Sequence, residues 1–353
     1  MRGSEVERKK MNSIKKISIV ILNWNGSSFL KRFLPSVVAC SKGNVEIVVA
    51  DNGSTDDSKT IIETLFPTVT YLQLKQNFGF AEGYNHALQS LESDYFLLLN
   101  SDVEVTPGWL GPMLQLMESD SSIGICQPKI LSLDRPDEFE YAGAAGGFID
   151  RFGYPYCRGR ILQEVEKDLG QYDQTMQVSW ASGACMMVRS NTWKACGGFD
   201  ADFWAHMEEI DLCWHAQHLG YSVYVCPASV VFHVGGGTLS YDNPMKLHLN
   251  FRNNLYLLFK NLPGNQLATK LPVRMILDGF AAFVFLLKGE FGSFGRVFSA
   301  HLKFYGNLPR LWKKRRSIFL TRRTKIVKLT TGKNILWNYY ILKRRKFSDV
   351  LID

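Results

Sequence analysis

The sequence predicts an α/β fold: a mostly parallel sheet flanked by helices, followed by a helical, basic C-terminal extension. Strand-like and helix-like segments alternate over residues 17–99. The strands are apolar on both faces, as is typical of parallel sheets that helices cover on each side. Three of the strands end in clusters of Asp, Asn and Gly. Ligands of such sheets bind beyond the carboxyl ends of the strands, so these clusters predict the position of the functional site.

Short apolar runs predict four buried strands, at residues 17–22, 45–50, 69–74 and 95–99. Helical spacing of apolar residues predicts helices between them, at residues 29–40, from a start at residues 54–57, and at residues 81–91. Residues 119–178 are less regular, with strand-like pieces, a Gly-rich stretch and an aromatic loop. After them we expect an apolar segment, a helix, a strand and then helices, at residues 178–189, 203–219, 223–234 and from 247 onward.

These patterns divide the chain into three parts. We expect an N-terminal tail at residues 1–15, an α/β domain at residues 16–262, and a basic, aromatic-rich helical region at residues 263–353. The N-terminus has no apolar stretch of the kind that a signal peptide needs. The seven Cys form no CxxC pair and are odd in number, so a reducing compartment fits best.

Charge is distributed unevenly along the chain. Residues 291–348 contain 16 Lys or Arg and no Asp or Glu. The rest of the chain has 41 − 16 = 25 basic residues against 33 acidic ones, a net charge of −8. An acidic body with a basic tail indicates an anionic partner for the tail, either a membrane surface or a nucleic acid. No nucleic-acid recognition motif is present, so we expect no nucleic acid.

Two acids that follow predicted strands are candidate ligand-binding groups. Asp51 could accept hydrogen bonds from a nucleobase or ribose, or it could cap a turn and helix. Asp102, in the sequence Asn100-Ser101-Asp102, could bind a divalent cation that also holds a diphosphate, because Mg²⁺ and Mn²⁺ prefer carboxylate and phosphate oxygens. The alternative for this second cluster is a polar turn.

Three acids open the helix predicted after residue 203. Glu208 and Asp211 are three residues apart and share a helix face, whereas Glu209 points elsewhere. The helix dipole favours acids in a first turn, but three acids after an aromatic, His-containing loop at residues 203–207 exceed what capping needs. A transferase needs one carboxylate to take a proton from an acceptor hydroxyl.

His233 ends an apolar strand and precedes Gly235 to Gly237. Glycines at this point would let a ligand approach the backbone closely. A metal ligand and a structural histidine are both open interpretations of His233.

Seven segments, in this order and spacing, resemble the family 2 glycosyltransferases with the GT-A fold, in particular the bacterial rhamnosyltransferase-like group. They cover much of residues 17–262. The segments are SIVILNWNG (18–26), VVADNGSTDDS (48–58), QNFGFAEGYNHAL (76–88), YFLLLNSDVEV (95–105), SGACMMVR (182–189), GGFDADFWAHMEEIDLCWHAQHLGY (197–221) and VVFHVGGGT (230–238).

The resemblance implies a role for each group of residues. Glu209 would be the catalytic base, with Glu208 and Asp211 orienting acceptor and base. Asp102 and His233 would hold a divalent cation, Mn²⁺ or Mg²⁺. Residues of the donor pocket, which binds the nucleotide sugar, would be Asn23, Asn25, Asp51, Asn77, Gly79, Asn100 and Asp102. Residues that border the acceptor would be Trp180, Ser182, Gly183 and His206.

The implied activity is inverting transfer of a sugar from dTDP-rhamnose or a UDP-sugar to a hydroxyl. The acceptor would be a glycan or a polyprenyl-linked molecule of cell-surface polysaccharide synthesis. The chain departs from the family pattern at Asn100, where the DXD-type motif has an acid, at Glu209, where Asp is common, and at His215, where many members have Arg. These residues fix neither the donor sugar nor the oligomeric state.

Two other functions compete with this interpretation. A sugar nucleotidyltransferase would need a basic, Gly-rich phosphate loop after the first strand, and here no Arg or Lys occurs before Lys31. A non-catalytic scaffold would have no use for Asp51, Asp102, Glu209 and His233 together.

The basic region has the composition of helices that lie in an anionic membrane interface. Its longest uninterrupted apolar stretch, residues 279–287, is too short to span a bilayer, which takes about 20 residues. Basic clusters at residues 313–316, 322–323 and 343–346 are interleaved with Phe, Trp and Tyr. We therefore expect a cytoplasmic protein, peripheral on the inner face of a bacterial membrane. The alternative is a helical extension packed on the α/β domain.

Overall fold

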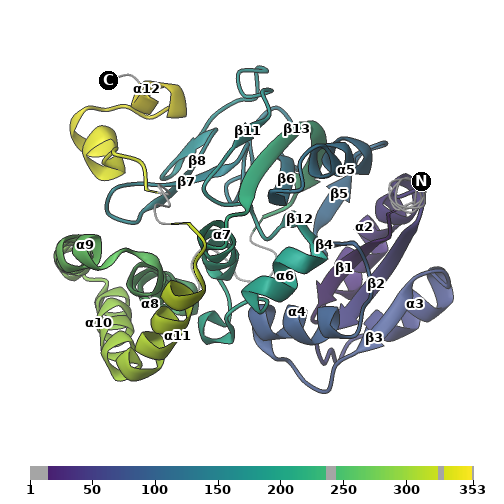
Figure 1. Ribbon diagram of the computed structural model, residues 1–353, viewed down its shortest axis with the longest axis horizontal. Coiled ribbons are helices and arrows are strands. Elements are labelled where there is room, and N and C mark those ends of the chain that lie inside the picture. The colour runs from purple at the N-terminus through teal and green to yellow at the C-terminus, as the bar shows by residue number, and fades with distance from the viewer. Residues whose placement is uncertain (1–14, 236–243, 325–329, 352–353) are drawn as a thin grey trace, which may run out of the picture.

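The computed structural model describes residues 15–235, 244–324 and 330–351 (Figure 1). Within them, a nine-stranded sheet has the order β11-β13-β6-β12-β4-β1-β2-β3, and β5 pairs with β13. The predicted strands are β1 (Ile17–Asn23), β2 (Val45–Asp51), β3 (Thr70–Gln73) and β4 (Tyr95–Asn100), and all run parallel. The predicted α/β class with a mostly parallel sheet is confirmed.

Helices α2 (Ser27–Cys40), α3 (Ser58–Leu65) and α4 (Gly79–Gln89) connect these strands. Neighbouring residues of β1 point to opposite faces, so Val20 packs in one core with α4 while Ile19 packs in a second core with α2 and α3. The sheet is therefore buried on both faces, which explains the continuous apolar runs. Helix α3 starts later than predicted, because residues 54–57 form a turn before Ser58.

The second half of the sheet is mixed. β12 (Cys185–Arg189) runs antiparallel to both β4 and β6 (Ile123–Ser132), while β13 (Ser222–His233) runs parallel to β6. Shorter elements complete this half: β5 (Val103–Val105), β11 (Met176–Gln177), α5 (Leu110–Ser119) and α6 (Ser190–Cys196).

The helix predicted at residues 203–219 is interrupted. A 3₁₀ turn, η1 (Ala201–Phe203), and the loop 204–207 precede α7 (Glu208–His218). Trp204, His206 and Met207 have φ values of 64°, 68° and 71°, which no α-helix contains. The helix therefore begins with the acids rather than before them.

Four helices follow the sheet: α8 (Pro244–Asn261), α9 (Gly264–Leu287), α10 (Phe291–Gly306) and α11 (Leu308–Thr321). They lie together on one side of the molecule (Figure 1), where α8 packs against α7, α10 and α11. None of the helices in the described part of the chain has the length and apolar character that crossing a bilayer requires.

The C-terminal residues pack against the segment at residues 119–178, which the sequence analysis described as less regular. That segment forms a four-stranded sheet of β7 (Gly147–Ile149), β8 (Pro155–Cys157), β9 (Arg160–Ile161) and β10 (Glu164–Val165) within the described residues. The π-helix η2 (Trp337–Ile341) and α12 (Phe347–Leu351) lie beside it (Figure 1). Phe347 stacks on Phe148 at 5.3 Å, and Arg345 pairs with Glu164. The basic cluster at residues 343–346 is thus separated from the other two, which lie on α11 and directly after it.

Candidate active site

Polar side chains meet at one edge of the sheet because the parallel strands end in register. Asn23 is the register partner of Asp51, and Asn100 is opposite Leu22. Asn23 Nδ2 donates to Asp51 Oδ2 at 3.1 Å. The structure thus brings together three residues of the predicted donor pocket.

The turn after β2 uses Asp51 as an anchor. Asp51 is 1% exposed, and its Oδ1 accepts from the Ser54 backbone N–H at 2.8 Å. Asn25 joins the same turn, since its Oδ1 accepts from the Thr55 N–H at 2.8 Å. The turn-capping interpretation of Asp51 is therefore realised. Contact with a nucleotide would use the remaining lone pairs of its carboxylate.

The loop at residues 77–79 is held by Asn52, which the sequence analysis did not single out. Asn52 Nδ2 donates to Asn77 Oδ1 at 3.1 Å and to the Gly79 carbonyl at 2.9 Å. Asn52 Oδ1 accepts from the Phe78 N–H at 3.0 Å. Gly79 has a φ of +77°, and a Cβ there would lie 2.6 Å from Trp204 Nε1. Only glycine fits this position without displacing the indole.

Asp102 and His233 lie against each other although 131 residues separate them. His233 Nε2 is 3.1 Å from Asp102 Oδ1, and each residue is 5% exposed. Asn100 Nδ2 is 3.5 Å from the same ring nitrogen. On the other side of the ring, Nδ1 is 3.4 Å from Glu140 Oε1, an acid that no motif marked. Burial lowers the pKa of His233, but the adjacent carboxylates of Asp102 and Glu140 raise it more, to about 10.

These groups fit a divalent cation that is shared with a substrate. A carboxylate and an imidazole at 3.1 Å can both reach one ion. In the described part of the chain, no group of three or more His, Cys, Asp or Glu is arranged to hold a metal. The remaining ligands would thus be diphosphate and water oxygens, as is usual for Mg²⁺ in phosphate-binding sites. Gly235 follows with a φ of +74°, whereas Gly236 and Gly237 lie outside the described residues.

Glu208 and Glu209 form a carboxyl pair at the start of α7. Burial raises the pKa of Glu208 well above its ordinary value, and the neighbouring charge of Glu209 raises it further. Burial also raises the pKa of Glu209, to about 7. The two carboxyl groups are close enough for each to shift the pKa of the other. Two acids with separated pKa values suit a proton acceptor beside a neutral partner.

Asp211 faces α8 instead of this pair. It is 4% exposed, with its two oxygens accepting from Lys260 Nζ at 2.6 Å and Asn261 Nδ2 at 2.8 Å. Lys260 also pairs with Asp200. Asp211 therefore joins α7 to α8.

Of the predicted acceptor residues, Gly183 lies beside Glu209. A Cβ on Gly183 would be 3.5 Å from Phe80 and 3.7 Å from Glu209 Cβ. The next carbonyl, of Ala184, accepts from the Asn100 N–H at 2.9 Å. Residues 182–184 therefore lie between Glu209 and the donor edge, by which we mean the edge of the sheet that carries Asn23, Asp51 and Asn100. Ser182 is 2% exposed, and its Oγ accepts from the Ala184 N–H at 3.2 Å.

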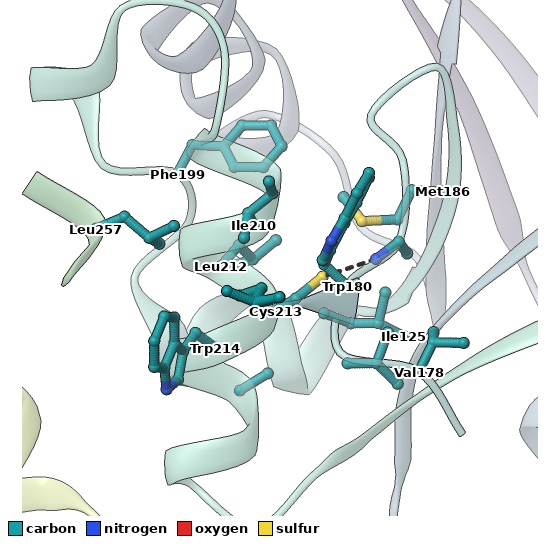
Figure 2. Close-up of a cluster of buried hydrophobic side chains, with 14 of the residues drawn as sticks. Ile125, Val178, Trp180, Met186, Phe199, Ile210, Leu212, Cys213, Trp214 and Leu257 are labelled. Atoms are coloured by element: carbon teal, nitrogen blue, oxygen red, sulfur yellow. Dashed lines mark hydrogen bonds between the residues drawn. The ribbon is translucent and has the colours of Figure 1, made fainter. Parts of the chain in front are cut away.

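Trp180 does not lie on that surface. It is 3% exposed, and its Nε1 donates to the Phe148 carbonyl at 2.9 Å. Figure 2 shows it in a buried cluster with Met186 and Cys213. An acceptor sugar has no access to this ring in the structure.

The loop 204–207 contacts the start of α4 at the donor edge and leads into α7, which carries Glu209. The Trp204 carbonyl accepts from the N–H groups of Phe80 and Ala81, at 2.9 and 3.1 Å, at the start of α4. The Trp204 side chain, which the sequence analysis passed over, is 43% exposed. His206 Nε2 is buried without a hydrogen bond, and burial lowers the pKa of His206 to about 4. The imidazole is therefore neutral at physiological pH.

Residues 18–190 match the family described as Glycosyl transferase family 2. A curated relative, the N-acetylglucosaminyl-diphospho-decaprenol L-rhamnosyltransferase of Mycobacterium tuberculosis, is 26% identical over 241 residues. The match covers 63% of this chain and 77% of the relative.

Two solved structures share the fold. GalNAc-T7 with UDP, GalNAc and Mn²⁺ superposes with a TM-score of 0.54 at 16% identity, covering 70% of this chain and 48% of that one. The chain thus spans about half the length of that protein. The mannosyltransferase PcManGT of Pyrobaculum calidifontis, with GDP-Man and Mn²⁺, gives a TM-score of 0.52 at 12% identity, with coverages of 88% and 84%. At these identities the likeness concerns the fold alone.

Proposed function

Because the chain belongs to glycosyltransferase family 2 and is a glycosyltransferase with the GT-A fold, we propose that it transfers a sugar with inversion from a nucleoside diphosphate to a hydroxyl. The proposed donor is dTDP-rhamnose or a UDP-sugar, and the proposed acceptor is a glycan or a polyprenyl-linked sugar. The relative from Mycobacterium tuberculosis is named as a rhamnosyltransferase that acts on a lipid-linked N-acetylglucosamine, which supports this choice.

The position of Glu209 is the observation that carries the proposal. Its carboxyl group has a pKa of about 7, and its Cβ lies beside Gly183 of the predicted acceptor stretch. In the proposed step, Glu209 takes the proton of the acceptor hydroxyl as that oxygen attacks the anomeric carbon. The bond from this carbon to the diphosphate oxygen breaks on the opposite face, so the configuration inverts. A base with a pKa near the working pH is the most effective at such a transfer.

Glu208 keeps its proton in this scheme, because burial and the neighbouring Glu209 both raise the pKa of Glu208, whereas Glu208 lowers the pKa of Glu209. It can then donate a hydrogen bond to the Glu209 carboxylate and orient it. Asn23, Asp51, Asn77 and Gly79 would position the nucleotide, which converts part of the binding energy into alignment of the reacting atoms.

Asp102 and His233 would hold a divalent cation, either Mn²⁺ or Mg²⁺. When bound, such an ion neutralises charge on a diphosphate leaving group. The adjacent carboxylate and imidazole, buried at the end of the donor edge, support this assignment.

A membrane surface is the proposed location. On α9 and α10, exposed apolar side chains recur at helical spacing: Ile276, Phe280, Phe283, Leu287, Phe291, Phe294, Phe298 and Leu302. We name these residues the α9–α10 apolar face. Ile276, Phe280 and Phe283, with Gly279, line an open apolar pocket on it. Such a continuous apolar surface on one face of a helix pair is typical of interfacial helices.

The charges around the α9–α10 apolar face favour an anionic membrane. Asp278, the acid within α9, is fully buried and paired with Arg274, so it adds no surface charge. Lys288, Arg296 and Lys303 are exposed on or next to the two helices, against one exposed acid, Glu290, so the surrounding surface charge is net positive. Attachment to the inner face of the cytoplasmic membrane would bring Glu209 to a lipid-linked acceptor.

A donor screen tests the transfer. The protein is incubated with Mn²⁺ or Mg²⁺ and a panel of UDP-, dTDP- and GDP-sugars, and release of nucleoside diphosphate is followed. We expect release from one donor, lost with EDTA and in Asp102→Ala. A folded protein that neither hydrolyses nor binds any donor in a metal-dependent way would contradict the proposal.

A further inference from the structure

The buried side chain of Asn253 faces the loop between η1 and α7. Asn253 lies on α8 and is 0% exposed. Its Nδ2 is 3.0 Å from the Phe203 carbonyl, 2.9 Å from that of Ala205 and 2.7 Å from that of His206. The two hydrogens of one amide group are thus shared among three backbone acceptors of a single short loop.

The neighbouring Arg252 fixes the orientation of this amide. Arg252 Nε and Nη2 donate to Asn253 Oδ1 at 2.9 and 2.8 Å. A flipped amide would set its NH₂ against the guanidinium and its oxygen against three carbonyls, so the assignment is unambiguous. Arg252 Nη2 also reaches the carbonyls of Asp202 and Phe203, at 3.0 and 2.9 Å. Together the two side chains bind four carbonyls in the segment 202–206.

The loop needs this support because its backbone is strained. Trp204, His206 and Met207 all have positive φ, which is disfavoured for side chains of this size. Such conformations persist only where the surroundings hold them. In this loop the Arg252–Asn253 pair binds the carbonyls on either side of Trp204.

The same loop determines the geometry of the candidate active site. The Trp204 indole covers Gly79 at the donor edge, and the Trp204 carbonyl caps α4. At its other end, the Met207 carbonyl accepts from the Asp211 N–H at 2.9 Å in the first turn of α7. That turn carries Glu209.

We propose that Asn253 is a positioning residue, which holds the loop 204–207 in the conformation that sets Trp204 against the donor edge and keeps Glu209 half-buried beside Gly183. This inference rests on the proposed function for its catalytic part. The competing explanation is that Asn253 only stabilises the fold.

Asn254 offers a matched control. It is the next residue on α8, is also 0% exposed, and donates to the Gly153 carbonyl at 2.7 Å, in the irregular segment. Asn253→Ala and Asn254→Ala each remove one buried amide from the same helix. Both should lower the midpoint of urea unfolding, but only Asn253→Ala should affect the active site.

Two readouts separate positioning from stability. Hydrogen exchange of the 204–207 amides should become faster in Asn253→Ala and stay unchanged in Asn254→Ala. In the pH profile of kcat, the acidic limb should move down by about one unit in Asn253→Ala, because a loosened loop lets water reach Glu209. At the optimum pH we expect kcat to fall by about 10–100-fold, the size of effect that misplacement of reacting groups produces.

Should Asn253→Ala fail to fold, Arg252→Met provides a second variant, since it removes the group that orients the amide but keeps the volume. Unchanged exchange in the loop and an unchanged acidic limb, in whichever of the two variants folds, would overturn the inference. If the wild-type protein turned over no donor, the proposed function would fail. The exchange measurement would still decide whether Asn253 holds the loop.

Discussion

Replacing Glu209 by Gln should strongly reduce turnover and at the same time stabilise the protein above neutral pH. The first effect follows from the loss of the proposed base, and the second from the low solvent access of Glu209 beside Glu208 and Gly183. Burial favours the protonated carboxyl group and raises the pKa of Glu209 from 4.5 to about 7. The folded protein therefore holds this proton more tightly than the unfolded chain does.

The sign and size of the stability effect follow from proton linkage. Between pH 4.5 and pH 7, the folded state binds more protons at this site than the unfolded state, so the free energy of unfolding falls as the pH rises. A shift of about 2.5 units corresponds to about 3 kcal/mol. Since Gln carries no charge, Glu209→Gln should be about 3 kcal/mol more stable than the wild type at pH 8, with no difference below about pH 4.5.

Urea unfolding at pH 8 and at the lowest pH where the protein stays folded measures the stability effect. Release of nucleoside diphosphate measures the activity, which should fall by about 10²–10⁴-fold in Glu209→Gln, the usual contribution of a general base. Glu63→Gln serves as the control, because Glu63 is 56% exposed on α3. Full turnover in Glu209→Gln would refute the assignment of the base. A stability gain that is the same at both pH values would refute the burial argument.

Three further changes test the other parts of the molecule. Asp102→Ala and His233→Ala should each weaken binding of Mn²⁺ in the presence of nucleoside diphosphate by at least about tenfold by calorimetry, and unchanged affinity would exclude a metal site there. Lys260→Met should lower the free energy of unfolding in urea by about 3–5 kcal/mol, because it leaves the buried carboxylate of Asp211 without its cation, whereas Asp200 keeps Lys314; a loss below about 1 kcal/mol would contradict the network. The double variant Phe283→Asp/Phe294→Asp should lose co-sedimentation with vesicles that contain anionic lipid while its donor hydrolysis stays unchanged, and retained sedimentation would place the membrane contact elsewhere.

The sequence by itself determined the parallel half of the sheet and its functional edge. Continuous apolar runs with polar turns at their ends are local patterns, and parallel strands bring such ends together whatever the rest of the chain does. That is why Asn23, Asp51 and Asn100 could be predicted as neighbours. The pairing of Asp102 with His233 was predicted only through the resemblance, since no local pattern connects residues so far apart.

Tertiary structure decided which polar group each buried side chain meets. The first-turn spacing of α7 placed Asp211 on the helix face of Glu208, but it did not determine which groups Asp211 binds. Its partners are Lys260 and Asn261 of α8. Trp180 was likewise predicted to border the acceptor. In the structure its Nε1–H donates to the Phe148 carbonyl, and the core covers its ring.

The position of the acids at a helix start could be predicted from the sequence, but the strained conformation of the loop before α7 could not. Residues 203–207 contain neither Gly nor Pro, the residues that usually mark positive φ and breaks in a helix. Three residues adopt positive φ there because buried Asn253 and Arg252 bind carbonyls that a helix would have used itself. Periodicity encodes which face of a segment is buried. The conformation of a strained loop depends on partners that only the folded chain brings into contact, since a buried carbonyl must find a donor wherever one lies.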